Sequence, residues 1–343
     1  MEDLTFLSQE DLVNVGLLDF KLAQRAVEKG LVWHSTGKSR SGKVALVLDL
    51  PEEWKFNGLV AVNGSYSAMK YVGSRTTNKA IGLPRTIATI VLADKSTGVP
   101  LAMMEGAAIS AIRTGCYAAV GLRYLGHQDR PNNVGIIGSS VMAKASLQAM
   151  VENYGQMIGD VFVYSKTREN REAFAKEASE RFGIEVYALD NSRDVVRNSD
   201  VSITAITRDD EILVRDDDAR EGATHIHIGG WGIDQKYTVR AAKEGKIYCD
   251  DWCAIKKRRE LILSKAFYED KISEKDIYGD IGSVINGSLP GREGLEPIHF
   301  YTVGLGELDL VMASELYEKA KEKGIGQKLK LWENDPVWLL QGY

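Results

Sequence analysis

The sequence predicts an α/β protein in which a parallel-sheet domain is inserted into an α+β domain. Between residues 126 and 305, short β-branched runs alternate with helical patterns, which is typical of a doubly wound parallel sheet. Between residues 43 and 104, strand patterns follow one another without helices between them, which favours an α+β domain. The 343 residues are enough for two cores. We place one domain at 1–125 plus 306–343 and the inserted domain at 126–305.

The first domain is expected to begin with a helical region and to continue into strands. Within residues 1–30, apolar positions recur at helical spacing from Leu12 to Val27, and Ser8 with Asp11 matches a capping box. A turn signal at residues 94–98 predicts a hairpin between the strands on either side of it. The expected strands are 43–49, 58–64, 69–73, 86–93 and 99–104, and the expected helices are 107–125 and 308–323.

The inserted domain is expected to alternate strands and helices from its first strand onward. Its helices are predicted at Ala143–Tyr154, Glu169–Phe182 and Val239–Glu244, with a short one before residue 201. Its strands are predicted at Val134–Ile137, Asp160–Tyr164, Glu185–Ala188, Val201–Ala205, His225–Ile228 and Lys246–Cys249.

A glycine turn joins the first of these strands to its helix. The turn reads Gly138-x-Ser140-x-x-Ala143, close to the G-x-G-x-x-G/A pattern of dinucleotide-binding turns. A helix N-terminus at this point offers unpaired N–H groups to a pyrophosphate. Ser140 replaces the middle glycine, and its hydroxyl, like that of Ser139, can donate to a phosphate oxygen. The position of the turn predicts a Rossmann-type dinucleotide site.

The end of the next strand indicates which dinucleotide binds. NAD enzymes usually place an acidic residue there for the ribose 2′-hydroxyl. This chain has Ser165, Lys166, Thr167 and Arg168 instead, and these cations and hydroxyls suit a 2′-phosphate. We therefore expect NADP(H) to be preferred, with NAD(H) as the alternative. An exposed polar turn without a ligand is the structural alternative.

Composition narrows the remaining classes of function. The net charge is −5 and the basic residues form no long stripe, so we expect no nucleic-acid partner. No apolar run approaches the length of a membrane span, and the acidic N-terminus lacks a signal-peptide core. The three cysteines fit a reducing compartment and supply no zinc site. We expect a cytoplasmic protein without a bound metal.

Four further motifs carry a resemblance to a known family. They are Gly82-Leu83-Pro84-Arg85, Asp94-x-x-Thr97-Gly98-x-Pro100, Glu105-Gly106-x-x-Ile109-Ser110-Ala111-x-Arg113-Thr114-Gly115 and Phe300-x-Thr302-Val303-Gly304. With the dinucleotide turn, the chain resembles the ornithine cyclodeaminase/mu-crystallin family over about residues 10–330. The Leu83-Pro84-Arg85 version is most similar to the branch that oxidatively splits an amino-acid/glutamate conjugate.

The resemblance implies a two-part, homodimeric enzyme that binds NAD(P) and handles amino acids or imines. Lys70 and Arg113 match residues that bind the substrate carboxylate, and a salt bridge within the chain is the alternative for both. Thr114 matches a contact to the cofactor phosphate, and Thr302 matches a serine near the nicotinamide. Arg85 replaces a threonine near the nicotinamide, which is consistent with a substrate that carries a second carboxylate.

One departure from the family pattern bears on the reaction. Cyclodeaminases carry a Gly-x-Asp after a sheet strand, and the aspartate acts as acid and base, but here Trp231 takes its place. Tryptophan cannot shuttle a proton, so the change disfavours deaminating cyclisation. Asp234 would replace the aspartate only if the loop is rebuilt. His227 is the other candidate for a proton donor, although packing under a helix is the more ordinary role for it and for His225.

We therefore expect NAD(P)H-dependent reduction of an imine derived from an amino or keto acid, or the reverse oxidation. The alternatives are a cyclodeaminase-type lyase with catalytic NAD(P), and a cofactor-dependent binding protein. The candidate catalytic residues are Lys70, Arg113, His227, Trp231 and Asp234. The expected cofactor contacts are Arg85, Thr114, Gly138, Ser139, Ser140, Val141, Met142, Ser165, Lys166, Thr167, Arg168, Ala205, Ile206, Thr207, Trp231 and Thr302.

Overall fold

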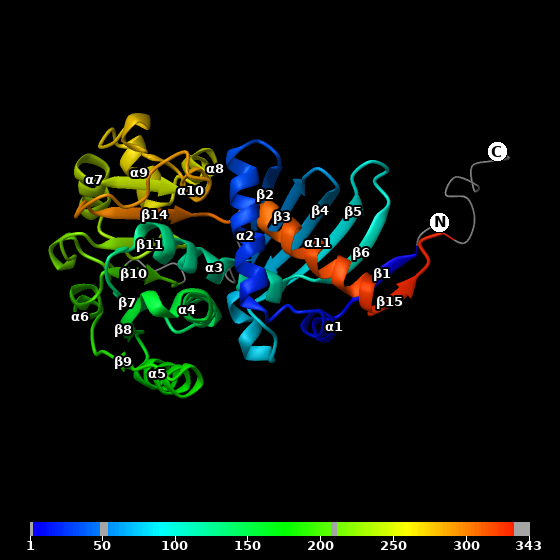
Figure 1. Cartoon of the computed structure of the whole chain (residues 1–343), viewed down its shortest axis with the longest axis horizontal. Coiled ribbons are helices and arrows are strands. Elements are labelled where there is room, and N and C mark those ends of the chain that lie inside the picture. The colour runs from blue at the N-terminus through cyan, green and yellow to red at the C-terminus, as the bar shows by residue number, and fades with distance from the viewer. Residues whose placement is uncertain (1–2, 49–53, 207–210, 333–343) are drawn as a thin grey trace. The chain divides into compact units, whose positions relative to one another are not determined.

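The structure is a computed structural model that describes residues 3–48, 54–206 and 211–332 (Figure 1). It divides into two compact units. The first comprises Met1–Leu18, Lys38–Ser110 and Gly306–Tyr343, and the second comprises Asp19–Gly37 and Ala111–Leu305. The second unit is therefore an insertion in the first, and the division differs from the predicted domain boundaries at 19–37 and 111–125.

Close packing explains why these two segments belong to the second unit. Helix α2 (Phe20–Ser35) packs on α10 (Ile281–Ile285), where a Cβ on Gly282 would lie 2.2 Å from the Leu31 carbonyl oxygen. Helix α3 (Ala107–Leu125) meets α4 (Val141–Tyr154) at Gly115, where a Cβ would lie 2.5 Å from the Ala145 backbone. Only glycine permits both approaches.

The first unit contains a seven-stranded sheet with one helix across it (Figure 1). The strand order is β15-β1-β6-β5-β4-β3-β2, antiparallel except for the parallel pair β1–β6. The predicted hairpin is confirmed as β5–β6. The elements are β1 (Leu4–Leu7), β2 (Arg40–Leu48), β3 (Trp54–Val62), β4 (Tyr66–Ser74), β5 (Thr86–Asp94), β6 (Pro100–Glu105), α11 (Gly306–Lys323) and β15 (Gln327–Leu329).

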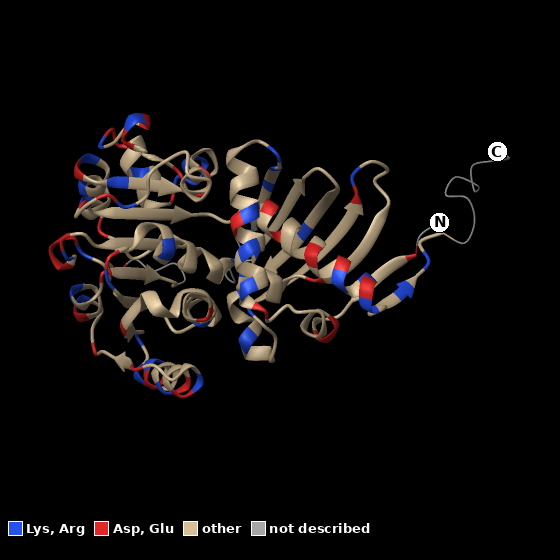
Figure 2. Ribbon diagram, viewed as in Figure 1, with Lys and Arg blue, Asp and Glu red and all other residues tan. Residues whose placement is uncertain are grey.

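The two faces of this sheet differ in burial. Leu59, Lys70, Ile90 and Met104 lie opposite one another in the register and are all buried, on the face that α11 covers. The strands carry mostly uncharged residues (Figure 2). The other face is apolar and exposed, and we call it the outer face: Val44, Leu46, Val60, Met69, Tyr71, Ile87 and Met103.

The second unit contains an eight-stranded sheet in which every pair is parallel, as the alternating pattern predicts. The order is β13-β12-β14-β11-β10-β7-β8-β9. The strands are β7 (Asn132–Ile137), β8 (Ile158–Tyr164), β9 (Val186–Ala188), β10 (Val201–Thr204), β11 (Thr224–Ile228), β12 (Lys246–Cys249), β13 (Gly279–Asp280) and β14 (Ile298–Thr302). The remaining helices are α5 (Arg168–Phe182), α6 (Ser192–Asn198), α7 (Gln235–Glu244), α8 (Trp252–Lys257) and α9 (Ile262–Tyr268).

The predicted helical region at residues 1–30 is divided by a break. Helix α1 (Gln9–Asn14) has the predicted capping box, because the Ser8 hydroxyl accepts from the Asp11 N–H at 3.2 Å. Gly16 then adopts a φ of +106°, and Asp19 caps α2 through the Lys21 N–H at 3.0 Å. A positive φ followed by a new N-cap ends one helix and starts another. None of the helices in the described part of the chain is long and apolar enough to span a membrane.

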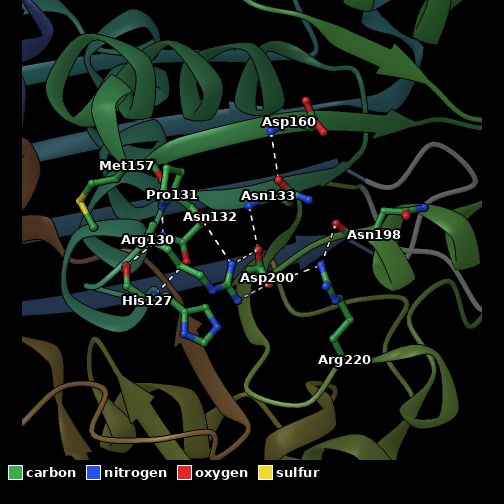
Figure 3. Close-up of polar contacts among 10 residues, drawn as sticks. All are labelled: His127, Arg130, Pro131, Asn132, Asn133, Met157, Asp160, Asn198, Asp200 and Arg220. Carbon is green, nitrogen blue, oxygen red and sulfur yellow. Dashed lines mark hydrogen bonds and ion pairs between the residues drawn. The ribbon is translucent and has the colours of Figure 1, made fainter.

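The buried carboxylate of Asp200 links the amino end of β10 to that of β7 in the second unit (Figure 3). Asp200, just before β10, accepts two hydrogen bonds from Arg130, at 2.9 and 3.0 Å. It also accepts from the Asn133 N–H at 2.9 Å and lies 3.4 Å from the Arg220 guanidinium. Burial raises the pKa of Asp200, but the Arg130 and Asn133 donors outweigh it, so the pKa lies below its ordinary value.

Candidate cofactor and active site

The glycine turn at the carboxyl end of β7 is closely packed. Gly138 has a φ of +124°, and a Cβ there would lie 2.4 Å from the Ala205 carbonyl oxygen. The Gly138 N–H donates to Tyr164 at the end of β8 at 2.8 Å, and Ala205 N–H donates to Ile137 at 2.9 Å. Three strand ends therefore meet here, and the turn admits only glycine.

The helix after the turn presents its N-terminus without a side-chain cap. Ser140 has the extended backbone of an N-cap, yet its exposed side chain makes no capping hydrogen bond. Ser139 is half-buried, Val141 is exposed and Met142 is half-buried. The fourteen-residue α4 thus offers backbone N–H groups and serine hydroxyls to an anion. These residues fit the pyrophosphate of a dinucleotide.

The basic turn after β8 lies at the surface. Lys166 and Arg168 are exposed and pair with Glu211 and Glu172, at 3.1 and 2.6 Å. The Ser165 hydroxyl donates to the Thr167 carbonyl at 3.1 Å. Exposed ion pairs of this kind contribute little, so both cations can reorient towards a phosphate. Ala205 and Ile206 follow β10 at the same edge of the sheet, and Thr207 lies outside the described residues.

Arg113 is buried on α3 beside the turn that follows β14. A Cβ on Gly304 would lie 2.8 Å from Arg113 Nη1 and 3.2 Å from Nη2, and Gly304 has a φ of +80°. Thr302, at the carboxyl end of β14, donates to the His227 carbonyl at 2.9 Å. Thr114 is half-buried next to Arg113. Arg113 therefore lies at the sheet edge where ligands of doubly wound sheets bind.

Lys70 and Arg85 lie in the first unit, apart in sequence from the sheet of the second. Lys70 is buried, with its Nζ 2.6 Å from Asp309 of α11 and 3.0 Å from the Ser110 hydroxyl. The salt bridge that was the alternative interpretation is thus present. Arg85 is half-buried before β5, and its Nε is buried and makes no hydrogen bond within the described residues.

The loop after β11 holds Trp231 and Asp234. Gly229, Gly230 and Gly232 all have positive φ, between +74° and +108°. Trp231 packs against the apolar cluster around Leu261 and Tyr301. Asp234 is the N-cap of α7 and accepts from the Lys236 N–H at 3.0 Å. The capping role favours a structural function for Asp234, since its side chain stabilises the helix start.

His227 belongs to a buried cluster with His225 and His299. His227 Nε2 lies 2.9 Å from His299 Nδ1, and its ring stacks on Tyr301 with centroids 3.6 Å apart. His225 Nδ1 lies 2.6 Å from the Ser202 hydroxyl. Burial lowers the pKa of all three, that of His225 to about 3. The arrangement favours the packing interpretation of His225 and His227.

This cluster predicts a loss of stability in mildly acidic solution. Each pKa is lower in the folded protein than the ordinary value of about 6.5, so the unfolded chain binds more protons below that pH. For each pH unit by which the solution is acidified below that value, each histidine lowers the free energy of unfolding by up to about 1.4 kcal/mol. Urea unfolding between about pH 7 and pH 5 measures the slope. His227→Phe should give a shallower slope than the wild type; equal slopes in the two proteins would contradict the explanation.

Sequence reasoning missed two features of this site. Strand β14 lies between β11 and β12, so β11 is internal and the Thr302–Gly304 turn lies at the centre of the carboxyl edge. The β-branched and aromatic run 298–302 could have predicted the strand. The second feature is Asp250, which is buried directly after β12. Two acidic residues after an apolar strand were the available signal.

Comparisons with known proteins agree with this geometry. The family model described as "Ornithine cyclodeaminase/mu-crystallin family" matches residues 6–324. The alanine dehydrogenase of Archaeoglobus fulgidus is 30% identical over 336 residues, 97% of this chain and 99% of that protein. The N-((2S)-2-amino-2-carboxyethyl)-L-glutamate dehydrogenase of Staphylococcus aureus is 27% identical over 269 residues, 78% of each chain.

A solved structure gives the same result for the fold. The Δ(1)-pyrroline-2-carboxylate reductase of Thermococcus litoralis, in complex with NADH and L-proline, is 29% identical with a TM-score of 0.83. The alignment covers 94% of this chain and 99% of that chain. The family match extends over nearly the whole described chain, and both units take part in it. This chain belongs to the ornithine cyclodeaminase/mu-crystallin family.

Proposed function

We propose that this protein is an NAD(P)H-dependent oxidoreductase that acts on a C–N bond. It reduces an imine derived from an amino or keto acid, or it oxidises the corresponding amine in the reverse direction of the same reaction. The observation that carries the proposal is the buried Arg113 beside Gly304, on the same sheet edge as the Gly138 turn. Three of the relatives described above are named for C–N chemistry on amino acids or cyclic imines.

The residues of the chain bind and orient the reactants. NAD(P)H supplies the hydride when bound. The Gly138 turn and the α4 N-terminus hold the pyrophosphate, and Thr302 lies at the edge expected for the nicotinamide. Arg113 holds the substrate carboxylate, for which its planar guanidinium provides two parallel donors. Lys70 and Arg85 are the further cations proposed for an anionic substrate.

The loop after β11 favours hydride transfer over cyclisation. Trp231 stands at the position where cyclodeaminases carry the acid/base aspartate, and it packs on apolar residues. Asp234 caps helix α7. Neither arrangement supplies a proton donor for deaminating cyclisation. Reduction of an imine needs none at this position if the imine nitrogen is protonated before it binds.

A substrate screen tests the proposed function. Oxidation of NADPH and NADH is followed by absorbance with cyclic imine carboxylates, and with pairs of a keto acid and an amine. We expect turnover with at least one imine that carries a carboxylate next to the C=N bond. Binding of the cofactor without turnover on any imine would favour a binding protein and contradict the proposal.

We further propose that NADP(H) is the preferred cofactor. The four residues directly after β8 include no acidic residue, and Lys166 and Arg168 among them are exposed cations with weak ion pairs. Replacing both with alanine should raise the KM for NADPH about tenfold or more, because charge-assisted contacts to the 2′-phosphate are lost. The KM for NADH should stay the same. Arg181→Ala, at the far end of α5, is the control; equal changes for both cofactors would contradict this assignment.

The exposed outer face of the first unit supports a homodimer. It is a contiguous apolar surface on strands β2 to β6, and such surfaces mark interfaces. Met69→Asp places a charge at its centre and should convert the dimer to monomers in light scattering after gel filtration. Leu18→Asp replaces an exposed apolar residue elsewhere and should leave the mass unchanged. A monomeric wild type, or a Met69→Asp variant that stays dimeric, would contradict this role of the outer face.

A further inference from the structure

Asp250 is a buried carboxylate that none of the predicted roles uses. It lies at the carboxyl end of β12, the strand next to β14, and is almost completely buried. We infer that Asp250 is a positioning residue that holds the Arg113 guanidinium where a substrate carboxylate binds. The inference rests on the proposed function, and it concerns the specificity of the site.

Four donors converge on the two oxygens of Asp250. The N–H groups of Val303 and Gly304 donate to Oδ2 at 3.0 and 2.8 Å, and Val303 also lies 3.1 Å from Oδ1. The Tyr117 hydroxyl donates to Oδ2 at 2.8 Å, and the Asp251 N–H donates to Oδ1 at 2.8 Å. The carboxylate thus fixes the backbone of the turn after β14.

The same contacts locate Arg113 from two sides. Tyr117 is four residues after Arg113 on α3, so both lie on one face of that helix. Gly304, which Asp250 binds through its N–H, has its Cα against the guanidinium, where a Cβ would be only 2.8 Å from Nη1. Asp250 therefore connects the helix that carries Arg113 to the turn that confines its guanidinium.

The chemistry of the contacts requires a carboxylate and not merely a polar group. All four neighbours donate, and an ionised carboxylate is the side chain that only accepts. Burial raises the pKa of Asp250 above its ordinary value, and the hydrogen bonds from Gly304, Tyr117 and Val303 offset only part of that rise. An asparagine of the same shape would direct its NH₂ group at one set of these donors, so the turn would have to move.

A movement of the turn should weaken recognition of the substrate carboxylate more than it weakens binding of the cofactor. A displacement of about 1 Å in a positioning group can cost on the order of a hundredfold in rate. None of the hydrogen bonds of the Asp250 carboxylate within the described residues involves the Gly138 turn or α4, so the affinity for the dinucleotide should be retained. The expected signature is a loss of preference for carboxylated imines at an unchanged KM for NADPH.

The experiment compares two imines that differ only in the carboxylate. We measure kcat/KM for a cyclic imine-2-carboxylate and for the same imine without the carboxylate, in wild type and in Asp250→Asn. The ratio of the two values should fall about tenfold or more in the variant. Asp280→Asn is the matched control, since Asp280 ends β13, the edge strand next to β12, and accepts from the Ser283 N–H at 2.9 Å as the cap of α10, and it should keep the ratio.

Tyr117→Phe is the second variant and decides the matter if Asp250→Asn does not fold. It removes one of the four donors and should lower the ratio by about two- to fivefold, as expected for one lost hydrogen bond. A wild-type ratio in either folded variant, or equal losses on both imines, would overturn the inference while leaving the proposed function intact. A wild type that reduces neither imine would instead overturn the proposed function.

Discussion

Arg113→Ala is expected to lower kcat/KM for a carboxylated imine by about a thousandfold, which corresponds to about 4 kcal/mol. The substitution removes a buried guanidinium that we propose pairs with the substrate carboxylate, and deleting one partner of a buried charge pair costs the most binding free energy. Initial rates at varied imine concentration measure the effect. The binding constant for NADPH should change little, because the proposed pyrophosphate site is the Gly138 turn with α4 and does not include Arg113.

Arg123→Ala is the control for this first prediction. Arg123 lies on the same helix, but it is exposed and contacts Gln128 at 3.1 Å. Its replacement should leave the rates within about twofold of wild type, as expected for a surface change. If Arg113→Ala folds with wild-type activity, Arg113 does not hold the substrate, and its burial is a matter of packing alone.

Asp200→Ala is expected to lower the free energy of unfolding by about 3 kcal/mol. Asp200 receives both arms of Arg130 and the Asn133 N–H at the amino ends of β7 and β10 (Figure 3). Removing it leaves the half-buried Asn133 N–H without this acceptor, while Arg130, whose side chain is 45% exposed, can turn to water. The loss should therefore fall at the lower end of the range for buried pairs.

Urea unfolding near neutral pH measures this second prediction. Because the pKa of Asp200 is lowered in the folded protein, its contribution is present above the unfolded pKa of about 3.9 and is lost as the pH falls through the folded value. Arg168→Ala breaks the exposed pair with Glu172 and should cost less than about 0.5 kcal/mol. Equal losses in the two variants would show that burial of the pair does not matter.

Local patterns predicted the elements that depend on nearby residues. The Ser8–Asp11 capping box, the β5–β6 hairpin and the alternation from β7 to β12 all arise within a few residues, and the structure contains them. Two units and a parallel sheet follow from the same patterns. Strand β14 was missed because it follows a long irregular segment and pairs with β11 and β12, which precede it by many residues.

The contacts of individual charged residues were much less predictable. Lys70 pairs with Asp309, which lies more than two hundred residues further along the chain, so no local pattern could decide between an ion pair and a ligand. Asp250 was missed because its partners are mainly backbone N–H groups of a distant turn, and N–H groups have no sequence signature. Gly138 is an exception, because its turn has a positive φ that favours glycine, so the residue type itself indicates the turn.

Trp231 separates the reaction proposed here from that of the cyclodeaminases. Its ring packs on the core around Leu261, and the Asp234 carboxylate is used as a helix cap. A lyase that uses the cofactor catalytically would return it to its starting state after each turnover. An imine reductase consumes one reduced cofactor for each C=N bond, and this difference can be measured directly.

The most direct test is therefore the stoichiometry of the reaction with purified protein. NADPH oxidation is followed by absorbance while imine loss and amine formation are followed by chromatography in the same sample. We expect one NADPH to be oxidised for each imine converted to its amino acid. Formation of a cyclic imino acid from a diamino acid without net oxidation of the cofactor would contradict it.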